Sequence, residues 1–375
     1  MKNHYDVILV GAGLYNATLA TRFRKLGKTV LVIEKRNHIG GNCYTEKKDN
    51  IDIHCYGSHI FHTSNKKVWD FVNQFTEFNT FELNTMATAE GKVYNLPFNM
   101  NTFHQLFGVV TPKEAREVLD QEKMKELMCV PSNLEEQAIS MVGRTIFNKL
   151  IKGYTEKQWH KDCKELPADI IKRLPLRYNY NNNYFNDKYQ GIPVNGYTAM
   201  IEKMFDGCDI LLDTDFLKDK EKWESMTEQV FYSGCIDEYY DYCYGELEYR
   251  GLRFETKRLE TENYQGCPVM NYTTHEKPYT RIIEHKWFNP SNESPVTYVT
   301  EEYPVDWKRG DIPYYPVNTD RNQEIYKKYR AIPNEKVKWV GRLSLYKYND
   351  MDDTIEQALN FPISIHGRIY MDALN

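Results

Sequence analysis

The sequence predicts an α/β fold in which a parallel sheet is assembled from separate chain segments and is joined by a helical insert and an antiparallel sheet. One observation is a largely apolar run that ends in a glycine turn and continues with helical periodicity over residues 6–26. Another is the return of apolar strands that end on glycine at 230–234 and 337–341. The last is a strand-like pattern with polar turns between 244 and 311, which is typical of an antiparallel sheet.

The opening unit is a strand, a glycine turn, a helix and a second strand. The first strand, at residues 6–10, stops at Gly11 and Gly13, and helical spacing begins at Leu14. Backbone N–H groups at the start of such a helix can face a pyrophosphate. The second strand ends at Glu34, about 20 residues beyond the glycines, where a carboxylate can accept a hydrogen bond from a ribose hydroxyl. This spacing predicts a Rossmann-like dinucleotide site.

The third glycine of the Gly-x-Gly-x-x-Gly pattern is replaced by Asn16, so we expect the helix and strand to lie slightly further apart. A βαβ unit without any ligand remains an alternative from these residues alone. Lys35 follows Glu34, and a Gly-Gly-Asn loop that contains Gly41 and Asn42 comes shortly afterwards. This order resembles the flavoprotein version of the unit, in which glycines let the backbone approach the dinucleotide. FAD is therefore preferred over NAD.

Composition narrows the possible partners and location. The chain has 375 residues, 41% hydrophobic and 27% charged, as in ordinary globular proteins, and its formal net charge is -5. This charge gives no basic field for nucleic acid or anionic lipid. We find no signal h-region and no apolar stretch long enough to span a bilayer, so we expect a cytoplasmic protein without membrane insertion. The 8 cysteines form no Cys-x-x-Cys pair, which predicts free thiols.

A histidine-rich segment follows the opening unit. Residues 51–63 alternate like a strand and end in a glycine turn with His59 and His62, which are three positions apart. That spacing could suit a metal, but a hydrogen-bonding role toward a flavin or a phosphate is favoured, and we expect no metal site.

Helix start signals dominate from about residue 79 to residue 150. Thr111-Pro112-Lys113-Glu114 is a capping box with proline at the first helical position, and Ser132 begins a second box. They predict a helical insert. We expect an FAD-binding domain at 1–78, 195–240 and 335–375, a helical domain at 79–170, and an antiparallel-sheet or substrate domain at 171–194 and 241–334.

Residues 153–197 combine aromatic side chains with a polar, proline-punctuated context. Tyr154, Trp159, Tyr184 and Phe185 are poorly placed for a core, and such rings could instead form a stacking surface for a base or a sugar. Arg173 lies on a short segment between prolines that could swing over a ligand. From the residues alone, a solvated helix face is the favoured interpretation of Arg173.

The chain as a whole resembles the bacterial type of UDP-galactopyranose mutase over roughly residues 5–360. The matching blocks keep their order and approximate spacing, which makes them more specific than a glycine motif. They include IEKRNHIGGN, YGSHIFHT, NLPFNMNTFHQ, KGYTEKQW, ELPADIIKRLP, PYTRIIEHK, DIPYYPVN and VGRLSLYKYNDMD.

The resemblance implies an isomerase that interconverts UDP-galactopyranose and UDP-galactofuranose without net redox. FAD is expected to act in its reduced form, its N5 attacking the anomeric carbon to give a flavin–sugar iminium. The expected partner is the UDP-sugar alone, with a homodimer as the usual assembly and galactofuranose supplied to surface polysaccharide. Two guanidiniums would stabilise the leaving diphosphate.

The resemblance also implies roles for individual residues. The expected catalytic residues are Arg173, Arg281 and His62. The expected substrate contacts are Asn84, Tyr154, Trp159, Tyr184, Phe185, Asn271, Tyr314 and Tyr348. The expected FAD contacts are Gly11, Gly13, Leu14, Glu34, Lys35, Gly41, Asn42, His59, Arg342, Asp350 and Met351. Arg173 thus changes from a solvated side chain to a diphosphate ligand.

Alternatives and departures remain. The alternatives are a UDP-N-acetylgalactopyranose mutase, an amine-oxidase-like flavin oxidoreductase, and a non-catalytic homologue that binds a UDP-sugar. Asn16, His160 and Asn349 depart from the pattern of the family. Pro362 interrupts the expected C-terminal helix, and the residues after it look strand-like.

Overall fold

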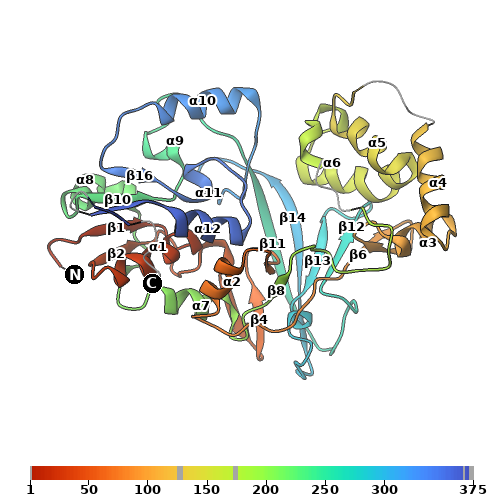
Figure 1. Ribbon diagram of the computed structural model, residues 1–375, viewed down its shortest axis with the longest axis horizontal. Coiled ribbons are helices and arrows are strands. Elements are labelled where there is room, and N and C mark those ends of the chain that lie inside the picture. Colours follow the sequence, from red (N-terminus) through yellow and green to blue (C-terminus); the bar gives the residue numbers. More distant parts are fainter. Residues whose placement is uncertain (1, 125–129, 172–175, 366–367, 371–375) are drawn as a thin grey trace.

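The computed structural model describes residues 2–124, 130–171, 176–365 and 368–370. Figure 1 shows a parallel sheet with its helices on one side of the molecule, a group of helices on the other, and long antiparallel strands between them. Among the described residues the parallel sheet has five strands in the order β16-β10-β1-β2-β9. Their bounds are β1 Val7–Val10, β2 Val30–Ile33, β9 Asp209–Leu211, β10 Gln229–Tyr232 and β16 Val337–Trp339.

The predicted opening unit is confirmed. Strand β1 is buried along its whole length because it is paired in parallel with β2 and β10 and covered on both faces. The chain then turns at Gly11, whose φ of 94° suits glycine, and enters α1 (Leu14–Lys25). The return of strands at β10 and β16 is also confirmed, so the Rossmann-like sheet draws on distant parts of the chain.

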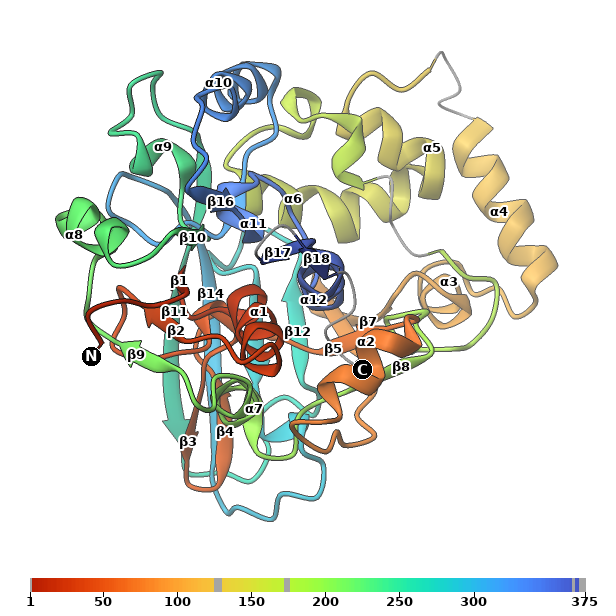
Figure 2. The same cartoon turned by 60° about the vertical axis from the view of Figure 1, so that its left-hand side comes forward.

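One face of this sheet is covered by α1, α7 (Gly196–Met204) and α12 (Met351–Asn360), which share a hydrophobic core with it. Figure 2 shows α1, α7 and α12 grouped together. Arg22 of α1 is fully buried, and its Nη1 donates to the carbonyl oxygens of Ala358 at 2.7 Å and Phe361 at 2.6 Å. A buried cation therefore holds the carboxyl end of α12, where the helix dipole favours positive charge.

The second large sheet of the described chain has seven strands in the order β15-β11-β14-β13-β12-β6-β7. Neighbouring strands are antiparallel except for β12 and β6, which run parallel. The bounds are β6 Thr85–Ala89, β7 Lys92–Leu96, β11 Tyr249–Leu259, β12 Val269–Tyr272, β13 Arg281–Glu284, β14 Thr297–Asp306 and β15 Tyr315–Pro316. The fold class expected from the sequence is confirmed, with a mixed but mostly antiparallel second sheet.

The helical unit contains α3 (Met100–Phe107), α4 (Pro112–Met124), α5 (Leu134–Ile146) and α6 (Gly153–Trp159), with a π-helical segment at Phe147–Lys152. The predicted capping box at Thr111 is confirmed by reciprocal hydrogen bonds with Glu114. Helix α5 is capped one residue later than expected, because the side chain of Asn133, and not that of Ser132, accepts from Glu136 N.

Two strands fall inside the range expected to be helical. β6 and β7 lie within residues 79–170 and join the seven-stranded sheet. One face of this hairpin packs into the core of the helical unit through Ala87, Ala89 and Tyr94. Both strands are only five residues long, and β6 gains its partner β12 from a distant part of the sequence. Local periodicity over five residues does not reveal such pairing.

Smaller elements complete the described chain. They are 3-10 turns at Gly41–Cys43, Cys163–Glu165, Ala168–Ile171, Phe216–Asp219 and His285–Phe288, strands β3 Thr45–Lys48, β4 Ile51–His54, β5 Phe61–Thr63, β8 Tyr189–Gly191, β17 Ile363–Ile365 and β18 Arg368–Tyr370, and helices α2 Lys66–Val72, α8 Lys220–Ser225, α9 Ile236–Tyr239, α10 Asp320–Arg330 and α11 Gly341–Ser344. The tail expected to be strand-like forms the antiparallel pair β17–β18. None of the helices in the described residues is both long and apolar enough to cross a bilayer.

Candidate active site

A cavity of about 890 Å³ lies where the carboxyl ends of the parallel strands approach the seven-stranded sheet and α6. Carboxyl ends of parallel strands meet at one edge of a sheet, which is where α/β proteins bind ligands. The predicted residues that line it are Gly11, Gly13, Leu14, Glu34, Lys35, Gly41, Asn42, His59, His62, Tyr154, Tyr184, Phe185, Asn271, Arg281, Tyr314, Arg342, Tyr348, Asp350 and Met351. The structure thus brings together side chains from all parts of the chain.

One end of the cavity has the shape that a dinucleotide requires. A Cβ on Gly11 would lie 2.3 Å from Ser233 Oγ, and one on Gly41, whose φ is 56°, would lie 3.1 Å from Gly13 Cα. By contrast, a Cβ on Gly13 would meet no described atom within 4 Å, so the space in front of this residue is open. Gly13 is the N-cap of α1 and brings no side chain of its own. The first N–H groups of α1 can therefore bind a pyrophosphate.

Glu34 lies at the end of β2 and is only 7% exposed. Its Oε2 accepts from the backbone N–H of Ala12 at 2.7 Å, and its Oε1 accepts from that of Arg36 at 2.8 Å. These bonds fix the carboxylate, and each oxygen keeps a second lone pair for a ribose hydroxyl. The neighbouring Lys35 lies at the rim, where its Nζ pairs with Asp215 at 3.4 Å and Glu238 at 3.3 Å.

Asn16 does more than fill the place of the third glycine. Its side chain is 1% exposed, and Nδ2 donates to the carbonyl oxygens of Val10 at 2.9 Å and Gly11 at 2.8 Å. The amide therefore joins the first turn of α1 to the end of β1. A glycine at this position would let α1 pack directly against β1. Here the Asn16 side chain fills the space between them and hydrogen-bonds to the end of the strand.

Arg281 projects from the start of β13 at the other end of the cavity. Its Nε donates to Glu302 Oε2 at 2.9 Å, and Glu302, its cross-strand partner on β14, is 1% exposed. A buried carboxylate with such a short contact fixes the direction of a guanidinium. Asn271, the partner of Arg281 on β12, has a buried Oδ1 with no hydrogen-bond partner among the described residues. An acceptor of this kind calls for a donor on a ligand.

Aromatic side chains line the walls between these ends. Burial raises the pKa of Tyr154 and that of Tyr184, so both phenols stay neutral and can donate hydrogen bonds. The His62 ring stacks on Phe185 with centroids 3.7 Å apart and an interplanar angle of 16°. Its Nδ1 lies 2.8 Å from Asp187 Oδ2. Asp187, which sequence reasoning missed, thereby orients His62 toward the cavity.

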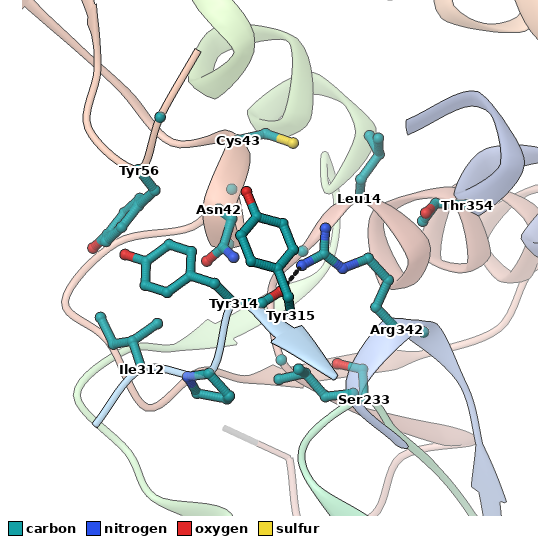
Figure 3. Close-up of a pocket in the computed structure, with 18 of the residues that line it drawn as sticks. Leu14, Asn42, Cys43, Tyr56, Ser233, Ile312, Tyr314, Tyr315, Arg342 and Thr354 are labelled. Atoms are coloured by element: carbon teal, nitrogen blue, oxygen red, sulfur yellow. Dashed lines mark hydrogen bonds between the residues drawn. The ribbon is translucent and has the colours of Figure 1, made fainter. Parts of the chain in front are cut away.

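Figure 3 shows the side of the cavity formed by the loop before β15 and by α11. Arg342 donates from Nη2 to the carbonyl oxygen of Tyr314, and its guanidinium lies 5.6 Å from the Tyr348 ring centroid. Asp350 is the N-cap of α12, and Met351 is the first residue of that helix. A second helix N-terminus therefore faces the cavity beside the first. Tyr56, Ser233 and Tyr315 also line the cavity, and although they lie in stretches noted in the sequence, no site role was expected for them.

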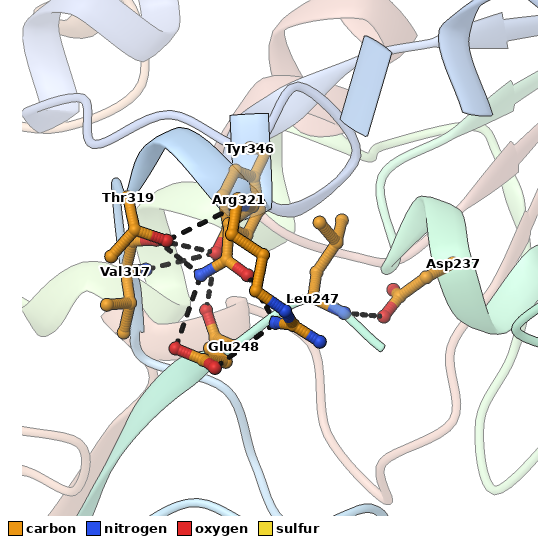
Figure 4. A network of polar contacts seen from close by, with 8 residues as sticks. Asp237, Leu247, Glu248, Val317, Thr319, Arg321 and Tyr346 are labelled. Carbon is orange, nitrogen blue, oxygen red and sulfur yellow. Dashed lines mark hydrogen bonds and ion pairs between the residues drawn. The ribbon is translucent and has the colours of Figure 1, made fainter. Parts of the chain in front are cut away.

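The turn that carries Tyr348 and Asp350 is anchored by hydrogen bonds of the preceding residue Tyr346. Tyr346 adopts a φ of 47°, an uncommon value for a residue with a side chain. Its hydroxyl donates to Glu248 O at 2.6 Å and accepts from Val317 N at 3.2 Å. Figure 4 shows this hydroxyl, from the residues just after α11, within a network that joins Glu248, which precedes β11, to Val317 and Thr319, which precede α10. The network secures the backbone on which two predicted site residues lie.

His59 is held by two neighbours. Its Nδ1 lies 2.8 Å from Gly57 O, which makes Nδ1–H the donor and leaves Nε2 as an acceptor. Burial lowers the pKa of His59 to about 4, so the ring is neutral at physiological pH. The backbone N–H of His59 donates to Nδ1 of His54 at 3.1 Å. His54, which is 1% exposed, was not singled out from the sequence because nothing local marks its burial.

Not every predicted contact reaches the cavity. Asn84 is exposed, and its Nδ2 donates to Glu82 O at 3.4 Å, while Leu83 and Thr85 on either side of it line the cavity. Trp159 packs against the core of the helical unit and is not part of the lining. Arg173 falls outside the described residues. The substrate roles of these residues stay predictions.

Comparison with known sequences shows the family to which the chain is similar. The profile of the family described as UDP-galactopyranose mutase matches residues 149–348, and that of the NAD(P)-binding Rossmann-like domain matches residues 9–75. A probable UDP-galactopyranose mutase from Klebsiella pneumoniae is 42% identical over 366 residues, covering 95% of this chain and 94% of the relative. A dTDP-fucopyranose mutase from Escherichia coli is 39% identical over 363 residues, covering 94% and 96%.

Solved structures share the fold. The crystal structure of a reduced UDP-galactopyranose mutase superimposes with a TM-score of 0.70 at 12% sequence identity, with 94% of each chain covered. A putrescine oxidase redesigned in its cofactor binding gives a TM-score of 0.58 at 13% identity, with 95% of this chain and 97% of that chain covered. At these identities the likeness concerns the arrangement of sheets and helices.

Proposed function

The chain belongs to the UDP-galactopyranose mutase family of nucleotide-sugar mutases, and on this premise we propose that it interconverts UDP-galactopyranose and UDP-galactofuranose with reduced FAD. The observation that supports this proposal most directly is the joining of two sites in one cavity. A glycine-lined helix N-terminus suited to a dinucleotide lies at one end, and Arg281 with its buried partner Glu302 lies at the other.

The described residues fit FAD. The open space in front of Gly13 leaves room for its pyrophosphate, Gly11 and Gly41 allow the close packing around this turn, and Glu34 offers carboxylate lone pairs to its ribose. Arg342 and the N-terminus of α12 line the same cavity and would also hold the cofactor. When bound and reduced, FAD would supply the nucleophile for the anomeric carbon in a reaction without net redox.

The protein side chains have separate tasks in this proposal. Arg281 stabilises the negative charge that develops on the diphosphate as its bond to the anomeric carbon breaks. Tyr314 and Tyr348 donate to the diphosphate oxygens, because a phenol keeps its proton at neutral pH, and burial raises the pKa of Tyr314 further. Asn271 accepts from a sugar hydroxyl through its unpaired Oδ1. The resemblance adds Arg173 as a second guanidinium.

The aromatic wall excludes water from the reacting bond. Tyr154, Tyr184 and Phe185 line the cavity beside Arg281, where an intermediate exposed to water would be hydrolysed. His62, oriented by Asp187, closes the wall next to Phe185.

We also propose a homodimer, which size-exclusion chromatography with light scattering would establish.

A second candidate substrate is a dTDP-fucose. It is favoured by the 39% identity to the dTDP-fucopyranose mutase, which nearly equals the 42% to the probable UDP-galactopyranose mutase. The two substrates differ at the pyrimidine methyl, the ribose 2′-hydroxyl and the sugar C6 hydroxyl, and each difference alters few contacts. We therefore propose the UDP-sugar first and test the dTDP-sugar in parallel.

The test is product analysis with purified FAD-loaded protein. UDP-galactofuranose, UDP-N-acetylgalactofuranose and dTDP-fucofuranose are each incubated with and without dithionite, and pyranose products are separated by chromatography. We expect UDP-galactopyranose to form only under reduction. If only dTDP-fucofuranose is converted, the protein is a dTDP-fucose mutase, as in the second candidate function. Absence of pyranose product from every sugar would contradict a mutase, and oxygen consumption without reductant would indicate an oxidase.

A further inference from the structure

Lys157 is a buried cation that no step of the proposed reaction uses. It lies in the last turn of α6 and is 9% exposed. Its Nζ donates to the backbone carbonyl oxygens of Tyr272 at 2.7 Å, Lys277 at 3.0 Å and Tyr279 at 2.8 Å. An ammonium has three N–H donors, so these carbonyls match its full donor capacity. All of them belong to the end of β12 and the turn that leads to β13.

That turn carries the substrate side of the cavity. Asn271 and Arg281 are the last paired residues of the β12–β13 ladder, and the bond from Tyr272 N to Thr280 O at 2.8 Å closes the turn beyond them. Tyr272 directly follows Asn271, and Tyr279 comes two residues before Arg281. Lys157 therefore binds both strands of the β12–β13 hairpin at the end of their paired region, where the hydrogen bonds between the strands would otherwise open most easily.

The other side of the contact is the helix that carries Tyr154. Tyr154 and Lys157 are three residues apart on α6, which places them on the same face. The helix lies close to the turn, since a Cβ on Gly153 would be 2.4 Å from Thr273 O. Thr273 Oγ1 adds a bond to Lys149 O at 2.7 Å. Lys157 thus joins a wall of the cavity on the helical unit to the Asn271–Arg281 pair on the sheet.

Lys157 keeps a charge in a position where burial makes a charge costly. Burial lowers the pKa of Lys157 to about 8, which reflects the cost of removing an ammonium from water. An apolar side chain of similar length would avoid that cost but would leave three backbone carbonyl oxygens without their donor. What an apolar side chain cannot do is hold carbonyls from both arms of a turn at fixed distances from one helix.

We propose that Lys157 is a positioning residue that sets the separation between α6 and the β12–β13 hairpin, and thereby the width of the site for a nucleotide diphosphate. It does not touch the reacting atoms and acts through Asn271, Arg281 and Tyr154. This inference rests on the proposed function for the class of its ligand, a nucleoside diphosphate. The separation that Lys157 sets lies between two parts of the protein, so the inference holds for either UDP or dTDP.

The test compares nucleotide affinity and stability in FAD-loaded protein. UDP and dTDP are titrated calorimetrically into the wild type, Lys157→Met, Lys157→Arg and the control Lys152→Met, with flavin content and Tm measured on the same samples. Lys152 is half-exposed and contacts Glu156 at 3.8 Å, so its change removes a surface charge from the same region. We expect Lys157→Met to raise the Kd of the preferred nucleotide on the order of tenfold. Lys157→Arg should recover part of the affinity, and Lys152→Met should match the wild type.

The outcomes separate the inference from the proposed function. A lower Tm in Lys157→Met with an unchanged Kd overturns the positioning role, because that is the result of a structural residue alone. If Lys157→Met does not fold, Lys157→Gln, which loses the charge and the third donor, is titrated in its place, and an unchanged Kd in that variant overturns the positioning role equally. A wild type that binds neither UDP nor dTDP overturns it as well. If the wild type binds nucleotide but turns over no sugar, the proposed reaction fails while the Lys157 comparison still decides the inference.

Discussion

Glu302 and Arg281 occupy paired positions on β14 and β13, and the 2.9 Å bond from Arg281 Nε to Glu302 Oε2 is formed by a carboxylate that is 1% exposed. Glu302 thus supplies the counter-charge for Arg281, whose guanidinium the proposed reaction uses. The direction of the guanidinium is consequently set before any diphosphate binds, which lowers the cost of organising the site.

We expect Glu302→Gln to lower kcat/KM on the order of tenfold, because the amide keeps the shape of the side chain but removes the charge that orients Arg281. Steady-state assays with reduced enzyme measure the effect. The matched control is Glu301→Gln, the next residue on β14, whose carboxylate pairs with Lys257 at 2.8 Å. Equal rates in both variants would show that Glu302 does not act through Arg281.

Removal of the guanidiniums themselves should be more costly. We expect Arg281→Ala and Arg173→Ala each to lose on the order of 3 kcal/mol of transition-state stabilisation, because each removes positive charge from the leaving diphosphate. The measurement is kcat under saturating substrate with dithionite. Flavin absorbance of each variant should stay at the wild-type level. Near-normal turnover in Arg173→Ala would mean that the role implied by the resemblance does not apply to this chain.

Restoring the missing glycine should weaken the protein. Asn16→Gly removes the bonds from Nδ2 to Val10 O and Gly11 O, so we expect the free energy of unfolding to fall by about 2 kcal/mol. Urea unfolding followed by circular dichroism measures the change. Asn16→Ala separates the lost bonds from the added flexibility of glycine. A variant that is more stable and binds FAD more tightly would contradict the bridging role of Asn16.

Acid should destabilise the fold through its buried histidines. Burial lowers the pKa of His285 to about 3 and holds the pKa of His54 well below 6.5, so the unfolded chain binds more protons than the folded chain below pH 6.5. Stability is therefore full above that pH and falls as the pH approaches the folded pKa. We expect His285 alone to remove on the order of 2 kcal/mol between about pH 7.5 and about pH 5.

The measurement is the urea midpoint as a function of pH. His285→Gln should be less stable than the wild type at neutral pH and should show a shallower loss on acidification, with His54 and His59 contributing to the remaining loss. His275→Gln is the control, because that side chain is 62% exposed and should leave the slope unchanged. A wild-type slope in His285→Gln would assign the acid sensitivity to other groups.

Local patterns predicted the parts of the site that depend on local geometry. The glycine turn before α1 and Glu34 at the end of β2 follow from spacing within one or two elements. The family resemblance added Arg281, Tyr314 and Tyr348, whose sequence neighbourhoods carry no chemical signal of their own. These residues lie in one cavity because separate segments converge there.

What the sequence did not reveal depends on register between distant strands. Glu302 lies in the run TYVTEEYPVD, where its side chain could not be distinguished from its neighbour Glu301 without knowing which face meets Arg281. Asp187 and His54 likewise gain their partners only through tertiary contact. The parallel pairing of β6 with β12 is of the same kind, since a short strand is stabilised by its neighbours more than by its own residues.

The interleaving of the parallel sheet has a consequence for biosynthesis. Adjacent strands β1, β10 and β16 come from residues 7–10, 229–232 and 337–339, and α12 at 351–360 completes the cofactor cradle. Such non-local pairing slows folding and cannot proceed before the later strands exist. A nascent chain on the ribosome must therefore wait for nearly its whole length before it can hold FAD. Cofactor capture is expected to be a late, post-translational event, and truncations before residue 337 should yield protein without flavin.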